Sequence, residues 1–242
     1  MIPNKSTARL AGFFYLLMLV FGGSSEIIKQ TIFISDDLAA TAANIMANDF
    51  TYRLSFLSSL IMMTSFVFLA LVLYKLLGSV NKNIAILMVV LVMVSVPINM
   101  LNLLNDYASL HLLSGAEYLS VFEKSQLQAQ VMLYHDLYLH GYEIASIFFG
   151  LWLIPFGFLV YKSGFLPRTL GILLVAGGCG LFLNVFVHFL FPDSTIVSTI
   201  LLIPGTVAEI GAILWLLIIG INESKVKVVS PGTVLCYKNE KQ

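Results

Sequence analysis

Two histidines, two acids and three tyrosines gather in the segment LYHDLYLHGYEIAS, residues 133–146, just ahead of a strongly apolar run. Within it, His140 and Glu143 are three residues apart, a spacing that places two side chains on one face of a helix. A further histidine, His188, lies in a later apolar stretch. Two imidazoles and a carboxylate from facing helices can hold zinc and leave one position open for a reactive water. One hypothesis is therefore a zinc centre that hydrolyses a lipid-like ester or amide.

The same residues also suit a purely structural role. The H-x-x-E spacing alone is common by chance, and the sequence contains neither H-E-x-x-H nor a cysteine cluster. In the zinc hypothesis Asp136 or Asp106 would orient a metal-bound histidine through a hydrogen bond. Structural histidines that hydrogen-bond to acids give the same pattern without a metal. Motifs for a phosphate-binding glycine loop, a nucleophile elbow and a dinucleotide site are absent from the sequence. The sequence thus leaves enzyme and non-enzyme open, and zinc is the only cofactor that it suggests.

The composition indicates where these helices must lie. Hydrophobic residues make up 59% of the 242 residues, charged residues only 11%, and the mean hydropathy is +0.93. A soluble domain carries roughly 25% charged residues, so this chain lacks the polar surface that it would need in water. Lys plus Arg balance Asp plus Glu at 13 each, which removes any net attraction to nucleic acid. We therefore predict a polytopic membrane protein whose general partners are membrane lipids.

Six stretches are apolar and long enough to cross a hydrocarbon core of about 30 Å, which takes about 20 helical residues. They are residues 10–33, 52–77, 84–106, 139–161, 169–191 and 196–221. The stretch from about 116 to 138 mixes apolar and polar residues at helical spacing, which predicts an amphipathic helix at the membrane surface. The expected fold is an all-α membrane bundle of six transmembrane helices plus this interfacial helix. It forms one domain over 1–222, followed by a short, flexible cytoplasmic tail, 223–242.

The basic residues predict the orientation. If the N-terminus is cytoplasmic, only Lys29, Arg53 and Lys124 of the basic residues fall on the other side. Cytoplasmic loops of membrane proteins are enriched in Lys and Arg. We therefore predict that both termini are cytoplasmic. The cytoplasmic segments then hold ten of the 13 basic residues, namely Lys5, Arg9, Lys75, Lys82, Lys162, Arg168, Lys225, Lys227, Lys238 and Lys241.

Polar side chains of the predicted spans converge on one layer. A charged side chain at mid-membrane costs about 2.5–3.5 kcal/mol, so it usually faces protein or water. Counting about 1.5 Å per residue from the cytoplasmic helix ends places these side chains toward the outer side. Helical phase brings Asp136, His140 and Glu143 within about 60° of one another. We predict an outward-facing polar cavity with these ligand-binding candidates: Glu26, Arg53, Asn102, Asp106, Asp136, His140, Glu143, Asn184 and His188.

Several of these residues have a local structural alternative. Glu26 and Lys29 are three residues apart and can pair with each other. Arg53 can anchor its helix at the membrane interface. The asparagines of the third span can join helices through hydrogen bonds. Three glycines of the fifth span suit close helix packing, namely Gly177, Gly178 and Gly180.

Three classes of function fit these observations. The first is a membrane protein that binds, and in one version transports, a small or amphiphilic ligand in the polar cavity. The second is the metal-dependent hydrolase, and the third is a structural or partner-regulating protein whose polar layer fixes helix packing. We favour ligand binding, because residues that only join helices can lie at any depth whereas these share one. Glu209, near the middle of the last span, is either a neutral hydrogen-bonding acid or part of a proton path, and the sequence does not separate the two.

Four segments of the chain support a family assignment, namely STARLAGFFYLLMLVFG, DDLAATAANIMANDFTYRLSFLSSL, LNLLNDYASLHLLSGAEYLSVF and FGFLVYKSGFLPRTLGILLVAGG. They resemble the DUF4386 family, a group of bacterial multi-spanning membrane proteins of unassigned function. The turn from Tyr161 to Arg168 is the most specific part, and the resemblance covers about residues 5–222. It implies a compact helical domain in the bacterial inner membrane. It carries over no catalytic or ligand-binding residue.

Overall fold

The computed structural model describes residues 3–34 and 37–225, and every regular element within them is helical. Six helices are long and apolar enough to cross a membrane. Their bounds are α1 Lys5–Ile32, α3 Asp49–Leu77, α4 Lys82–Leu112, α5 Lys124–Ser163, α6 Arg168–Leu190 and α7 Thr195–Leu214. The predicted all-α bundle with six transmembrane helices is confirmed. The predicted tail, 223–242, lies mostly outside the described residues.

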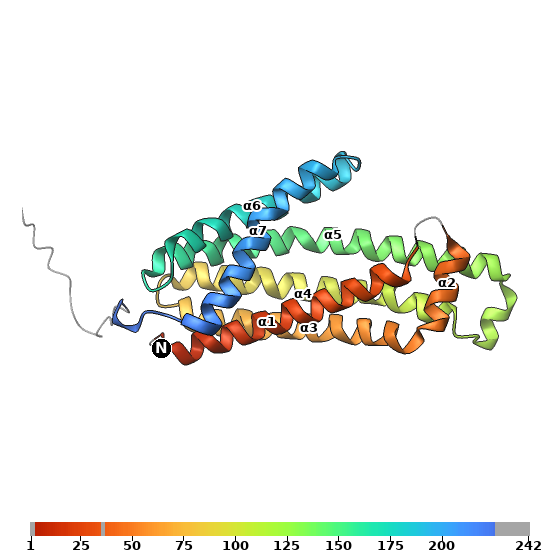
Figure 1. Ribbon diagram of the computed structural model, residues 1–242, viewed down its shortest axis with the longest axis horizontal. Helices are drawn as coiled ribbons and strands as arrows, with labels where there is room; N and C mark the ends of the chain where they lie inside the picture. Colours follow the sequence, from red (N-terminus) through yellow and green to blue (C-terminus); the bar gives the residue numbers. More distant parts are fainter. Residues whose placement is uncertain (1–2, 35–36, 226–242) are drawn as a thin grey trace, which may run out of the picture.

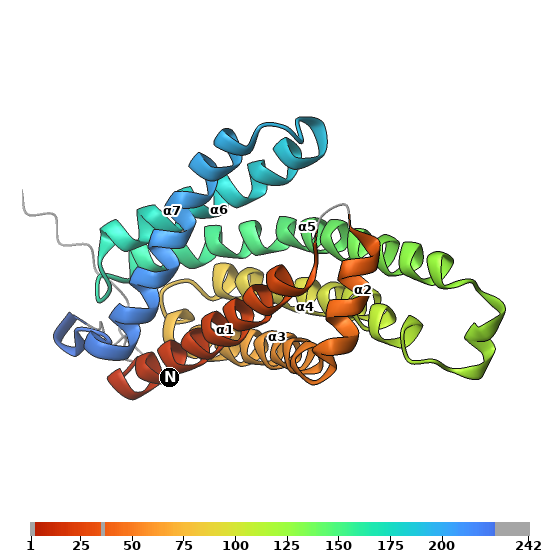
Figure 2. The same ribbon diagram turned by 45° about the vertical axis from the view of Figure 1, so that its right-hand side comes forward.

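The helices form a bundle with a helical pair added on one side. Helices α1, α3, α4 and α5 lie alongside one another, and α6 packs on α5 (Figure 1). The far ends of α6 and α7 diverge from the other helices in both views (Figure 2). Helix α7 then returns to the start of α1 and ends in a π-helical turn, Trp215–Ile219. There the backbone N–H of Lys5 donates to the Glu223 side chain at 2.9 Å, so the start of the first span and the end of the last span lie at the same end of the bundle. An even number of spans requires this arrangement.

The orientation can be tested at three exposed loop positions. We expect cysteines introduced as Asn48→Cys and Asp193→Cys to react with a membrane-impermeant maleimide in intact cells, and Ser79→Cys to react only after permeabilisation. The background should carry Cys179→Ala and Cys236→Ser, because both native cysteines could react. Labelling at position 79 but not at 48 and 193 in intact cells would reverse the predicted orientation.

Helix α5 corrects the predicted division between an interfacial helix and the fourth span. It begins at Lys124, where Glu123 and Gln126 form a capping box, and continues for 40 residues to Ser163. At about 1.5 Å per residue it is about 60 Å long, twice the hydrocarbon thickness of about 30 Å. No proline interrupts it before Pro155, so nothing ends the helix where the polar face gives way to the apolar span. The stretch 116–138 is therefore a short 3₁₀ turn, Glu117–Val121, followed by the first turns of α5.

A short helix, α2 (Leu38–Ala47), has no counterpart among the predicted elements. The Asp37 side chain caps it by accepting a hydrogen bond from the Ala40 N–H at 2.8 Å. Its buried residue Ile45 packs in a second apolar cluster with residues of α3 and α5, including Tyr52 and Val131. This cluster explains why the first turns of α5 stay with the bundle instead of lying on the membrane surface.

Glycines allow α5, α6 and α7 to approach closely. A Cβ atom on Gly150 would lie 2.8 Å from the Gly178 carbonyl oxygen, and one on Gly157 would lie 2.6 Å from the Gly171 oxygen. On the other face of α6, Gly177 meets Gly205 of α7 with the same crowding. These contacts confirm the predicted packing role of the glycines in the fifth span.

Candidate functional site

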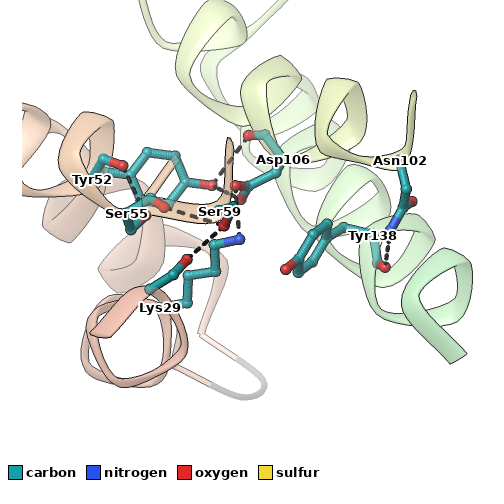
Figure 3. Close-up of polar contacts among 8 residues, drawn as sticks. Lys29, Tyr52, Ser55, Ser59, Asn102, Asp106 and Tyr138 are labelled. Carbon is teal, nitrogen blue, oxygen red and sulfur yellow. Dashed lines mark hydrogen bonds and ion pairs between the residues drawn. The ribbon is translucent and has the colours of Figure 1, made fainter. Parts of the chain in front are cut away.

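A buried ion pair joins α1 to α4. Lys29 Nζ lies 2.8 Å from Asp106 Oδ2, and both side chains are almost fully buried (Figure 3). Neither atom makes a regular hydrogen bond with another described group. Removing two charges from water costs several kcal/mol per ion, and their mutual attraction offsets this only when the geometry is good and further polar contacts help. The surrounding side chains supply those contacts.

Two tyrosines complete this cluster from α3 and α5. The Tyr52 hydroxyl donates to Asp106 Oδ1 at 2.7 Å, and the Lys29 ammonium lies 3.9 Å from the centre of the Tyr138 ring (Figure 3). A cation over an aromatic face is stabilised by about 0.5–2 kcal/mol, more when desolvated. We call Lys29, Tyr52, Asp106 and Tyr138 the ion-pair cluster. It joins four helices, and Lys29 and Tyr138 also line an open groove on its outer side.

Asn102 extends this cluster through the backbone. Its amide donates to the Tyr138 carbonyl oxygen at 2.8 Å and accepts from the Asn105 amide at 3.0 Å. Gly141 makes room for it, because any Cβ at that position would clash with the Asn102 amide. Asn102 therefore joins α4 to α5, which is the structural alternative that the sequence left open.

Lys29 does not pair with Glu26. Glu26 is exposed and accepts a hydrogen bond from Gln30 at 2.9 Å, because the lysine turns inward to Asp106. Glu26 and the exposed Asp136 line an open groove of about 490 Å³ beside the ion-pair cluster. These two candidates therefore lie near Asp106 but on the surface.

Arg53 lies apart from the other candidates. It is exposed and forms an ion pair with Asp49 at 2.8 Å, one turn earlier on α3. Exposed pairs of this kind contribute about 0–1 kcal/mol. The structure brings Arg53 to no cavity that the other candidates line.

The three residues of the zinc hypothesis are not gathered into one site. The rings of His140 on α5 and His188 on α6 lie edge to face, with their centres 6.1 Å apart. Glu143 instead lines a cavity that neither histidine lines. In the described part of the chain, no three His, Cys, Asp or Glu side chains are close enough to hold a metal ion. The i, i+3 spacing is too loose a constraint, since it leaves Glu143 and His140 free to face different neighbours.

The cavity that Glu143 lines lies between five helices and measures about 290 Å³. We call it the central cavity. Its wall is mostly apolar, with two carboxyl groups, one amide and the hydroxyl-bearing side chains of Tyr142 and Ser146 among methionines and aromatic rings. The lining residues are Met18, Met62, Met63, Phe66, Tyr142, Glu143, Ser146, Phe149, Trp152, Leu181, Asn184, Leu202 and Glu209.

Two acceptors of the central cavity stand out among its polar groups, Glu209 and Asn184. Glu209 Oε1 accepts from the Tyr15 hydroxyl at 2.8 Å. Asn184 Oδ1 is buried and has no hydrogen-bond partner among the described residues. The sequence pointed to Glu143 and Asn184 but left Glu209 apart and did not single out Tyr15. The depth of Glu209 in its span was the available signal, because a mid-membrane acid needs a polar neighbour.

Six apolar helices around buried polar side chains define a polytopic α-helical membrane protein. The chain belongs to the family described as "Domain of unknown function (DUF4386)", which it matches over residues 10–220. The resemblance stated from the sequence is thereby confirmed. No curated protein and no solved structure matches the chain. The family description assigns no activity, so the function has to be argued from the geometry.

Proposed function

We propose that this protein binds a small amphiphilic ligand in the central cavity, within the bacterial cytoplasmic membrane. The observation that carries the proposal is a cavity of about 290 Å³ whose mostly apolar wall holds a few converging polar groups. Ligand sites in proteins have this composition and start at about 300 Å³. The bacterial inner membrane follows from the family resemblance, and the predicted orientation places the cavity toward the outer side.

The two groups of buried polar residues differ in a way that supports binding over packing alone. The ion-pair cluster matches one cation to one anion and donates a hydrogen bond to the acid. In the central cavity Asn184 Oδ1 has no partner, and no basic side chain lines the wall. Buried polar atoms are nearly always paired, so an unpaired acceptor on a residue that lines the cavity suits a site that a ligand completes.

Calorimetry on the protein in an uncharged detergent, with a micelle-only blank, tests the proposal. The probes are 4-phenylbutylamine, 4-phenylbutan-1-ol and 4-phenylbutyrate, which share one apolar body and differ in the head group. We expect saturable binding of at least one probe. Leu181→Trp, which fills the cavity from α6, should weaken it about tenfold or more, because the cavity is only about 290 Å³.

Leu183→Trp is the matched control, because Leu183 lies two residues along the same helix and is half exposed on its outer surface. It should leave the affinity unchanged. Binding of none of the three probes, or equal loss in both tryptophan variants, would contradict a ligand site in the central cavity.

A further inference from the structure

We propose that the ligand of the central cavity is an organic cation, an amine or ammonium group on a small apolar body. This inference rests on the proposed function and adds the charge and the hydrogen-bonding character of the ligand. In it, the positive head lies between Glu143 and Glu209, and the apolar body lies against the methionines and aromatic rings of the wall.

The charges of the cavity are unbalanced. Glu143 and Glu209 line it, whereas no Lys, Arg or His of the described chain does. The ion pairs of the described residues are Lys29 with Asp106 and Arg53 with Asp49, so neither glutamate has a basic partner there. Both glutamates are partly buried within membrane-spanning helices, where a carboxylate without a cation is costly, and a cationic ligand would supply the missing charge.

Two hydrogen-bond acceptors on the cavity wall are left without a described donor, although the wall also holds donors such as the Asn184 amide nitrogen and the Tyr142 hydroxyl. Tyr15 occupies Glu209 Oε1, which leaves Oε2 to accept a further bond. Asn184 Oδ1 is buried and accepts none from a described residue. An ammonium group brings N–H donors and no acceptor, so it complements a site that offers acceptors. An anionic head group would bring no N–H donor for the free acceptors of the cavity, and its negative charge would lie close to the two glutamates.

The apolar wall suits the same ligand. Its aromatic rings are Phe66, Tyr142, Phe149 and Trp152, and aromatic faces attract cations. The chain already uses this contact, since Lys29 lies over the ring of Tyr138. Methionine side chains adapt to ligands of different outline because they are flexible and polarisable, and three of them line the cavity: Met18, Met62 and Met63.

The three probes named above also test the charge. At pH 7 we expect 4-phenylbutylamine to bind about tenfold or more tightly than the alcohol, because hydrogen bonds between charged partners are the stronger ones. 4-Phenylbutyrate should bind more weakly than the alcohol. Glu209→Gln and Glu143→Gln should each reduce the preference for the amine over the alcohol, because each removes a carboxylate from the cavity wall. Glu209→Gln keeps an oxygen for the Tyr15 hydroxyl, which limits structural change.

The control is Glu117→Gln, which removes an exposed acid from the loop before α5 and should leave the preference intact. If amine and alcohol bind equally and Leu181→Trp weakens both, the cavity binds ligands but the cationic class is wrong. A tenfold preference that survives both carboxamide substitutions would also overturn it, since the cation would then lie elsewhere. If no probe binds at all, the proposed function itself fails.

Discussion

Lys29→Met and Asp106→Asn, each introduced alone, are expected to lower the free energy of unfolding by about 3–5 kcal/mol, because each leaves an unpaired charge among buried side chains. The double variant should recover most of this loss, since no charge then remains. Asparagine at 106 also keeps an oxygen that accepts from the Tyr52 hydroxyl. The measurement is thermal or sodium dodecyl sulfate unfolding of the purified protein.

The exposed pair Arg53 with Asp49 provides the control. Arg53→Met and Asp49→Asn should each leave the unfolding free energy almost unchanged, because solvent screens both charges. If the double variant at 29 and 106 instead loses the sum of the two single losses, the pair is not coupled and the cluster needs another explanation.

The fold was largely predictable because span length and hydropathy are properties of contiguous sequence. The six spans could be placed from runs of apolar residues, and their hydropathy is what lets the helices cross a membrane. The continuity of α5 was not predictable in the same way. A polar face before an apolar run also fits a separate surface helix, and only the packing of Val131 against α2 and α3 decides between the two.

The residue types of the candidate site could be predicted from the sequence. Which of these side chains contact one another was harder to predict. Asp106 was singled out as an acid in a span, but its cation could not be identified, because Lys29 has a nearer acid in the sequence, Glu26. The spacing of residues along a helix identifies side chains that are neighbours on that helix. It does not show which face of the helix packs against which other helix. Ion pairs between distant helices therefore need the tertiary structure.

The central cavity illustrates the same limit for apolar residues. Its methionines and phenylalanines look in the sequence like side chains that face lipid, since both environments are apolar. Leu181 and Leu183 lie two residues apart on α6, and one faces the cavity while the other faces outward. Only the polar minority, Glu143, Asn184 and Glu209, left a signal that sequence analysis could use.

Gly178→Ala is expected to destabilise the protein by about 1–3 kcal/mol, because the contact that it disturbs is with backbone. A Cβ atom at this position would lie 2.7 Å from the Gly150 carbonyl oxygen and 3.0 Å from the Leu153 Cβ. A rotamer change cannot relieve a clash with a carbonyl oxygen, so α6 would have to move away from α5. Helix α6 also carries Asn184 and Leu181, so the same variant should weaken binding of the probe amine.

Gly23→Ala is the matched control for this prediction, because Gly23 also lies within a membrane helix but a Cβ there meets nothing within 4 Å. Alanine favours a helix over glycine by up to about 1 kcal/mol, so this variant should be as stable as the native chain or slightly more so. Unfolding curves of both variants, with calorimetry of 4-phenylbutylamine, separate the effects. If Gly178→Ala were as stable as Gly23→Ala, the close approach of α5 and α6 would not hold the cavity wall in place. Loss of stability together with loss of binding would show that helix packing positions the cavity.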